Sequence, residues 1–141
     1  MTNNDYVLLV EDNPDEVLLT HRAFKKNNIS NPLKTVTDGR QALDFLFSQD
    51  SQANRDISNK PALILLDLNL PLVSGLDVLK EIRNNPITSG IPIVVLTSST
   101  ENRDKAESYR LGANDYIQKP TGLIDFIEII KRIKFRWLDC N

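Results

Sequence analysis

Short apolar runs alternate five times with segments of helical periodicity, and this alternation restricts the fold more than any other feature. Apolar runs of this length, rich in β-branched residues, are typical of buried strands. The runs span residues 6–10, 33–37, 62–66, 91–97 and 114–118. A strand followed by a helix returns to the sheet in parallel, so the pattern predicts the α/β class. We expect a doubly wound five-stranded parallel sheet of order 2-1-3-4-5, which is the flavodoxin-like arrangement.

The segments between the strands carry helix signals. We expect helices over 14–27, after Asp38-Gly39, over 75–85, over 101–111 and from about 121. Asn13-Pro14 supplies an N-cap and a proline at the first helical position, and Glu16 stands where a capping-box acid would bond the Asn13 N–H. Gly112 is suited to end the fourth helix.

The fourth helix, 101–111, is mostly polar. Its apolar area comes mainly from Ala106, Tyr109 and Leu111. Helices that bury little apolar area are the ones that can shift. Because this helix lies next to the strand ending at Thr97, we expect it to form part of an output surface.

Length and composition indicate one domain over 1–141, with an extended flexible loop at 48–60 and a C-terminal extension at 136–141. The net charge of −2 gives no general attraction to nucleic acid or anionic membranes. No apolar run approaches the length of a membrane helix, and Cys140 has no second cysteine to pair with. We expect a cytoplasmic protein.

Polar side chains follow four of the five predicted strands. Glu11 and Asp12 follow the first strand, Asp67 the third, Thr97 ends the fourth and Lys119 follows the fifth. In an open parallel sheet, ligands bind beyond the carboxyl ends of the strands, where the strand order reverses. The order 2-1-3-4-5 places that point between the first and third strands. We therefore expect these five side chains to converge on one site.

The convergence explains why a core strand, ALILL, leads directly into an acid. Three carboxylates in one place repel one another, and a dication relieves that repulsion. Oxygen ligands without histidine or cysteine favour Mg²⁺, which also accepts phosphate oxygens. Lys119 adds a positive charge and Thr97 a hydrogen-bond donor. The set suits a phosphoryl group, with Asp67 as the nucleophile that becomes an aspartyl phosphate.

These residues resemble the receiver domain of two-component response regulators over essentially the whole chain. The spacings of 30 residues from Asp67 to Thr97 and 22 from Thr97 to Lys119 are similar to those of single-domain chemotaxis regulators. The resemblance implies that Asp67 accepts phosphate from a sensor histidine kinase. It also implies that Asp12 binds Mg²⁺ directly, Glu11 mostly through water, and Asn69 through its backbone carbonyl.

The same resemblance assigns roles to the remaining residues. Thr97 and Tyr116 would be the coupled switch pair. Lys119 would contact the phosphoryl group, and the Lys119–Pro120 peptide bond would be cis. Asn69 and Ser99 would tune the lifetime of the phosphate. Phosphorylation would draw Thr97 inward, turn Tyr116 inward, and remodel the face of the fourth helix, fifth strand and last helix.

Two features depart from the common pattern. Glu11 replaces the more usual aspartate, which the family tolerates because that metal contact is indirect. Asp12 and Asp67 are 55 residues apart because of the long 48–60 loop. The loop and the C-terminal extension resemble the small stand-alone regulators paired with bacterial phytochromes.

Three other functions share some of these features. A haloacid-dehalogenase-type hydrolase needs its nucleophile on the first strand and an acid two residues later, where this chain has Asn69 after Asp67. A flavin-binding module needs a phosphate-welcoming loop after the first strand, and EDNPDE would repel a phosphate. A degenerate receiver that signals by binding alone is disfavoured because every expected site residue is present.

The chain has no Walker loop, kinase motif or output domain, so its phosphate and its message must pass through other proteins. We expect a phytochrome-type or other sensor histidine kinase upstream, and a target protein, a phosphotransferase or a second copy in a homodimer downstream. We expect no enzyme activity beyond assistance to its own phosphorylation and dephosphorylation.

The segment KRIKFRW, residues 131–137, is interpreted as a solvated helix face with a packed Trp137, not as a nucleic-acid contact. His21 is expected to be exposed.

Overall fold

A computed structural model describes residues 5–47 and 60–138. Its sheet is parallel, in the order β2-β1-β3-β4-β5, as the sequence predicts. The strands are β1 (Val7–Val10), β2 (Leu33–Val36), β3 (Leu63–Leu66), β4 (Ile93–Thr97) and β5 (Asp115–Gln118). The helices are α1 (Pro14–Lys26), α2 (Gly39–Phe47), α3 (Gly75–Asn84), α4 (Asn102–Arg110) and α5 (Leu123–Ile133), which continues into a π-helical turn, η3 (Lys134–Leu138). Residues 48–59 of the expected loop and 139–141 of the expected extension lie outside this description.

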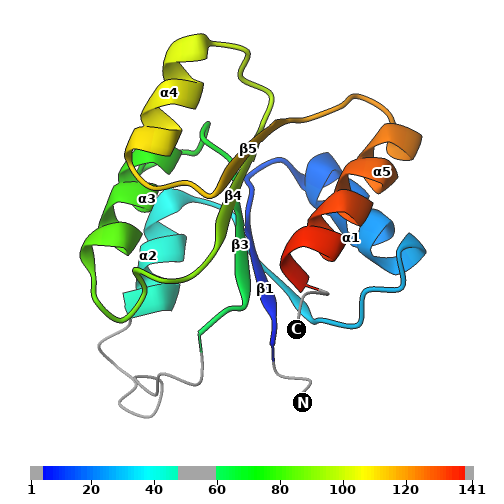
Figure 1. The fold of residues 1–141 in the computed structure, drawn as a ribbon, viewed down its shortest axis with the longest axis horizontal. Coiled ribbons are helices and arrows are strands. Elements are labelled where there is room, and N and C mark those ends of the chain that lie inside the picture. Colours follow the sequence, from blue (N-terminus) through cyan, green and yellow to red (C-terminus); the bar gives the residue numbers. More distant parts are fainter. Residues whose placement is uncertain (1–4, 48–59, 139–141) are drawn as a thin grey trace.

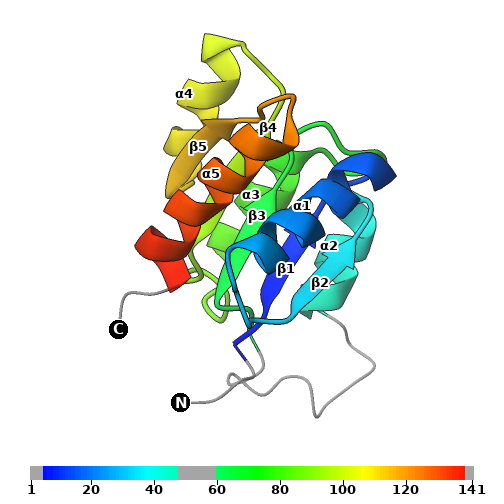
Figure 2. The same ribbon diagram turned by 90° about the vertical axis from the view of Figure 1, so that its right-hand side faces the viewer.

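The helices cover both faces of the sheet. Figure 1 shows α2, α3 and α4 on one face and α1 and α5 on the other, and Figure 2 looks onto the α1–α5 side. Successive side chains of a strand point to opposite faces. Leu8 and Val10 of β1 therefore enter the core beneath α2 and α3, while Val7 and Leu9 pack with Phe126 of α5. The central strands are buried on both faces, which makes their ends rigid supports.

The strand register brings distant polar residues together. Val10 of β1 lies opposite Leu66 of β3, and the backbone N–H of Asp67 donates to the Val10 carbonyl at 3.1 Å. The residues that follow, Glu11 and Asp67, consequently leave the sheet side by side.

The start of α1 is held as predicted by Asn13, but the capping box is absent. The Asn13 side chain accepts hydrogen bonds from the backbone N–H groups of Asp15 at 2.9 Å and Glu16 at 3.3 Å. The Asn13 N–H donates to Glu11 Oε2 at 3.1 Å instead of to Glu16. The capping role predicted for Glu16 is wrong, because its carboxylate pairs with Lys119 across the sheet.

The polar helix α4 buries little, and of the three residues expected to supply its apolar area only Leu111, at the C-cap, is partly buried against the core. Ala106 is exposed, Tyr109 is 44% exposed, and Ser108 is the buried residue of the helix. Gly112 follows the last turn with φ +109°, which confirms its role in ending the helix. Arg83 of α3 holds this end, donating to the Gly112 carbonyl at 2.9 Å and to Asn114 Oδ1 at 2.8 Å.

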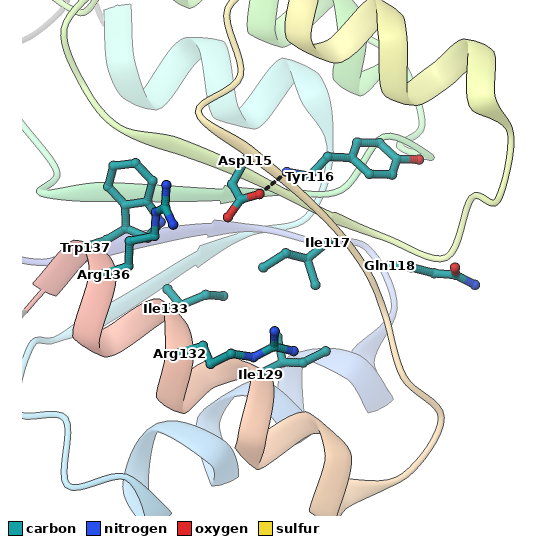
Figure 3. Close-up of a pocket in the computed structure, with 9 residues that line it drawn as sticks. All are labelled: Asp115, Tyr116, Ile117, Gln118, Ile129, Arg132, Ile133, Arg136 and Trp137. Carbon is teal, nitrogen blue, oxygen red and sulfur yellow. Dashed lines mark hydrogen bonds between the residues drawn. The ribbon is translucent and has the colours of Figure 1, made fainter.

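β5 is the last strand of the sheet order, and beside it lies a hollow lined by β5, α5 and η3. Figure 3 shows Trp137 and Arg136 at one end of this hollow and Tyr116 pointing away from it. Trp137 packs against the α1–α5 core, as predicted, and His21 is exposed, as predicted.

Across the described ranges, no helix combines the length and the apolar character needed to span a membrane.

Candidate functional site

The ammonium group of Lys119 is the centre of a buried ion cluster at the carboxyl ends of β1, β3 and β5. Its Nζ lies 2.5 Å from Glu11 Oε1 and 3.1 Å from Asp67 Oδ2. It also pairs with the carboxylate of Glu16 from the first turn of α1. Three carboxylates therefore meet one ammonium, so the cluster holds an excess of negative charge.

The cluster is largely closed to solvent. Glu11, Asp67 and Lys119 are 3%, 5% and 9% exposed, and Thr97 is fully buried. Asp12 is exposed, but it offers an oxygen within 4.8 Å of those of Glu11 and Asp67. Buried charges of this kind need partners. The cluster meets solvent at Asp12, which is exposed, and at Glu16, which is partly exposed.

The surroundings shift the ionisation of the cluster. Burial raises the pKa of Glu11 from 4.5 to about 7, and the charge of Asp67 adds to this, against the hydrogen bond from Lys119. Burial alone would lower the pKa of Lys119, but its hydrogen bonds to Glu11 and Glu16 and the charge of Asp67 raise it above the ordinary lysine value. Lys119 is therefore a permanent positive charge at neutral pH.

The donor set fits a hard divalent cation. Glu11, Asp12 and Asp67 each contribute a carboxylate oxygen, and the oxygens are close enough to share one ion. Oxygen-only ligands suit Mg²⁺, Ca²⁺ or Mn²⁺. The excess of negative charge around Lys119 would favour a further positive charge here. The structure therefore supports divalent-metal binding by these three residues.

Asp67 is the first residue of the loop 67–74 that connects β3 to α3. Its Oδ1 accepts a hydrogen bond from the Asn69 N–H at 3.2 Å, while the Asn69 side chain is exposed. A Cβ on Gly75 would collide with the Asp67 carbonyl oxygen and lie 2.5 Å from Leu68 Cα. The start of α3 is thus packed directly against the backbone that carries Asp67. The metal contact of the Asn69 carbonyl and the effect of Asn69 on phosphate lifetime stay predictions.

Thr97, Ser99 and Tyr116 form a connected group beside the cluster. The Tyr116 hydroxyl donates to the Ser99 carbonyl at 3.1 Å, and the Ser99 N–H donates to Thr97 Oγ1 at 3.4 Å. Thr97 and Tyr116 are therefore linked through Ser99. Their function as a switch pair, and the effect of Ser99 on phosphate lifetime, stay predictions.

The Lys119–Pro120 peptide bond is trans, so the prediction of a cis bond is wrong. The trans isomer is the more stable one for a bond before proline. With this bond trans, Lys119 contacts Glu11, Glu16 and Asp67 together.

Sequence reasoning missed Glu16. Glu16 lies three residues after Asn13, where an acid is explained locally as part of a capping box. That local explanation hid the contact of Glu16 with Lys119, 103 residues away. Helical spacing gives no signal here, because Asp12 precedes α1, which begins at Pro14 after the extended N-cap residue Asn13.

Comparison with known proteins agrees with this geometry. Residues 7–132 match the family model of the response regulator receiver domain. The chain is 40% identical to the response regulator Rcp1 of Synechocystis sp. over 133 residues, covering 94% of this chain and 88% of Rcp1.

Two solved structures are similar over nearly their whole length. The phosphorylated cyanobacterial phytochrome response regulator RcpA has a TM-score of 0.87 at 38% identity, covering 96% of this chain and 94% of RcpA. The Mn²⁺-bound form of Rcp1 has a TM-score of 0.86 at 39% identity, covering 97% of this chain and 96% of Rcp1. The chain described here thus belongs to the response regulator receiver domain family, whose members work in two-component signalling.

Proposed function

We propose that Asp67 is the phosphoacceptor of this receiver and that a sensor histidine kinase supplies its phosphoryl group. The observation that carries this proposal is the 3.1 Å contact between Asp67 Oδ2 and Lys119 Nζ inside a cluster of metal-binding oxygens. A carboxylate held there meets both requirements of phosphoryl transfer, which are positioning and charge stabilisation.

In the transfer, a carboxylate oxygen of Asp67 forms a bond to phosphorus while the P–N bond of the phosphohistidine breaks. The electron pair of that bond stays on the imidazole nitrogen. Lys119, already within hydrogen-bond reach of Asp67, contacts the incoming phosphoryl oxygens, and the Thr97 hydroxyl donates to one of them. Their role is to stabilise charge that the ground-state carboxylate lacks.

The proposed cofactor is Mg²⁺, held by Glu11, Asp12, Asp67 and the Asn69 backbone carbonyl. When bound, the ion would offset the repulsion between the carboxylates and the phosphoryl oxygens. Support comes from the all-oxygen donor set and from the Mn²⁺-bound form of the related Rcp1.

The proposed output is a change of the face formed by α4, β5 and α5, through Thr97 and Tyr116. The partners would be a phytochrome-type kinase, in line with the name of the related RcpA, and a downstream target or phosphotransferase in the cytoplasm. A homodimer is a further proposal, which gel filtration with and without acetyl phosphate would test. Beyond its own phosphorylation and dephosphorylation, the chain would turn over no substrate.

The intact mass of the protein after incubation with acetyl phosphate and Mg²⁺ tests the main proposal. We expect one phosphoryl adduct in the wild type, none in Asp67→Asn, and none when EDTA is present. An exposed aspartate on α3 provides the matched control, because Asp77→Asn should form the adduct as the wild type does. Absence of the adduct from the wild type would favour a degenerate receiver that acts by binding alone.

A further inference from the structure

Ser99 is the residue at which the candidate site, β5 and α4 meet. Its N–H donates to Thr97 Oγ1, and its carbonyl accepts from the Tyr116 hydroxyl, at 3.4 and 3.1 Å. Its own hydroxyl donates to Asp104 Oδ2 at 2.6 Å. Asp104 lies in the first turn of α4. A single residue therefore touches both proposed switch side chains and the start of the polar helix.

Ser99 also contacts the residue that precedes α4, a helix whose start has no side-chain cap. Its N-cap residue, Glu101, makes no side-chain hydrogen bond to the first turn, and Ser108 is the buried residue of the helix. The Ser99 hydroxyl also accepts from the Glu101 N–H at 3.3 Å. The first N–H groups of a helix need such partners, and a missing cap costs helix stability. The bond from the Glu101 N–H serves the N-cap residue itself rather than the first-turn N–H groups, and together with the Asp104 contact it ties Ser99 to the start of α4.

We propose that Asp104 is a positioning residue that couples the phosphorylation site to α4 by holding the Ser99 hydroxyl. The inference rests on the proposed phosphorylation of Asp67 for its functional consequence, but the contact itself stands without it. Hydrogen bonds to a carboxylate are short and strong compared with neutral ones. The bond to Asp104 therefore fixes the orientation of Ser99, and with it the carbonyl that Tyr116 binds.

The coupling follows from the order of contacts. A displacement of Thr97 toward a phosphoryl group moves the acceptor of the Ser99 N–H. Because Ser99 is tied to Asp104, the first turn of α4 must follow or break that bond. Few buried contacts oppose such a movement, since α4 is polar and only partly packed.

Amide hydrogen exchange of α4, measured in the full chain without phosphodonor, tests the contact. We expect Ser99→Ala and Asp104→Ala each to accelerate exchange roughly tenfold, and the double variant to do no more than either single one. Ser99→Thr keeps the hydroxyl and Asp104→Asn keeps an acceptor, so both should stay close to the wild type. Asp125→Ala in the first turn of α5 removes a similar acid without touching Ser99, and should leave α4 unchanged.

The coupling is tested by repeating the exchange with acetyl phosphate and Mg²⁺ while the adduct is quantified by intact mass on the same samples. We expect the adduct in both wild type and Asp104→Ala, with altered α4 exchange in the wild type only. Equal responses of α4 in the two proteins would overturn the proposed coupling. Additive effects of the two alanine variants without phosphodonor would overturn the contact itself. Absence of the adduct in the wild type would refute the phosphorylation of Asp67, and the coupling with it.

Discussion

Lys119 Nζ lies 3.1 Å from Asp67 Oδ2 although the two residues are 52 positions apart in the sequence. The contact exists because β3 and β5 end at the same edge of the sheet, and because Lys119 is anchored through its backbone N–H to the Thr97 carbonyl at 2.8 Å. The same ammonium also pairs with Glu11 and Glu16. It therefore serves both folding and the proposed phosphoryl transfer.

Replacing Lys119 by methionine should weaken both functions. The side chain keeps its length, but three carboxylates lose their shared cation, so the free energy of unfolding should fall by about 2–4 kcal/mol at pH 7. The rate of adduct formation with acetyl phosphate should fall about 100-fold. Urea unfolding and intact-mass kinetics measure the two effects. Lys80→Met, at an exposed lysine of α3, is the control, and equal behaviour of the two variants would contradict the prediction.

Glu11 should make stability depend on pH. Its pKa rises from 4.5 in the unfolded chain to about 7 in the folded protein, so the folded protein holds the proton more tightly between these values. The free energy of unfolding should therefore decrease as pH rises from 4.5 to 7, by about 2.5 kcal/mol. Urea unfolding in EDTA measures this, and Glu11→Gln should remove that part of the slope. Parallel plots of unfolding free energy against pH for the wild type and Glu11→Gln would refute the role of Glu11 in this pH dependence.

Gly75→Ala should destabilise the protein despite the better helix propensity of alanine. Alanine favours a helix over glycine by about 1 kcal/mol. The new Cβ would, however, meet the backbone of Asp67 and Leu68, and forced overpacking costs about 1–3 kcal/mol. Because backbone atoms yield less than side-chain ends, we expect a net loss of about 1–2 kcal/mol. Gly90→Ala is the control, since a Cβ there meets nothing within 4 Å. Equal stability of both variants would show that α3 can move away from Asp67.

The convergence of Glu11, Asp67 and Lys119 was predictable because it follows from a rule about strand ends. Each residue comes directly after a strand of an identifiable parallel sheet. The register of β1 and β3 then places Glu11 beside Asp67, because Val10 lies opposite Leu66. The burial of Ser108 in α4 was not predictable, because hydropathy ranks Ala106 and Tyr109 above it. Its hydroxyl donates to the Asp104 carbonyl within its own helix at 2.8 Å, which allows a polar side chain to be buried there.

The contacts of Glu16 and Asp104 were also beyond sequence reasoning. Both acids occupy first turns of helices, where acids are common for local reasons, so no pattern separates a cap from a long-range partner. Which group each acid contacts depends on where a neighbouring loop places a hydrogen-bond donor. Lys119 and Ser99 lie in such loops, and loop geometry is not encoded in hydrophobic periodicity.

Glu16→Gln should accelerate phosphorylation. The Glu16 carboxylate pairs with Lys119 and is 32% exposed, so it competes with an incoming phosphoryl group for the same ammonium. Removing its charge should free Lys119 at modest cost, because partly exposed pairs contribute little, and should raise the rate of adduct formation about threefold. Intact-mass kinetics with acetyl phosphate and Mg²⁺ measure this rate. The matched control is Asp15→Asn, which removes an exposed acid from the same helical turn and should change the rate little. A slower rate in Glu16→Gln than in Asp15→Asn would mean that Glu16 holds Lys119 in its working position rather than competing for it.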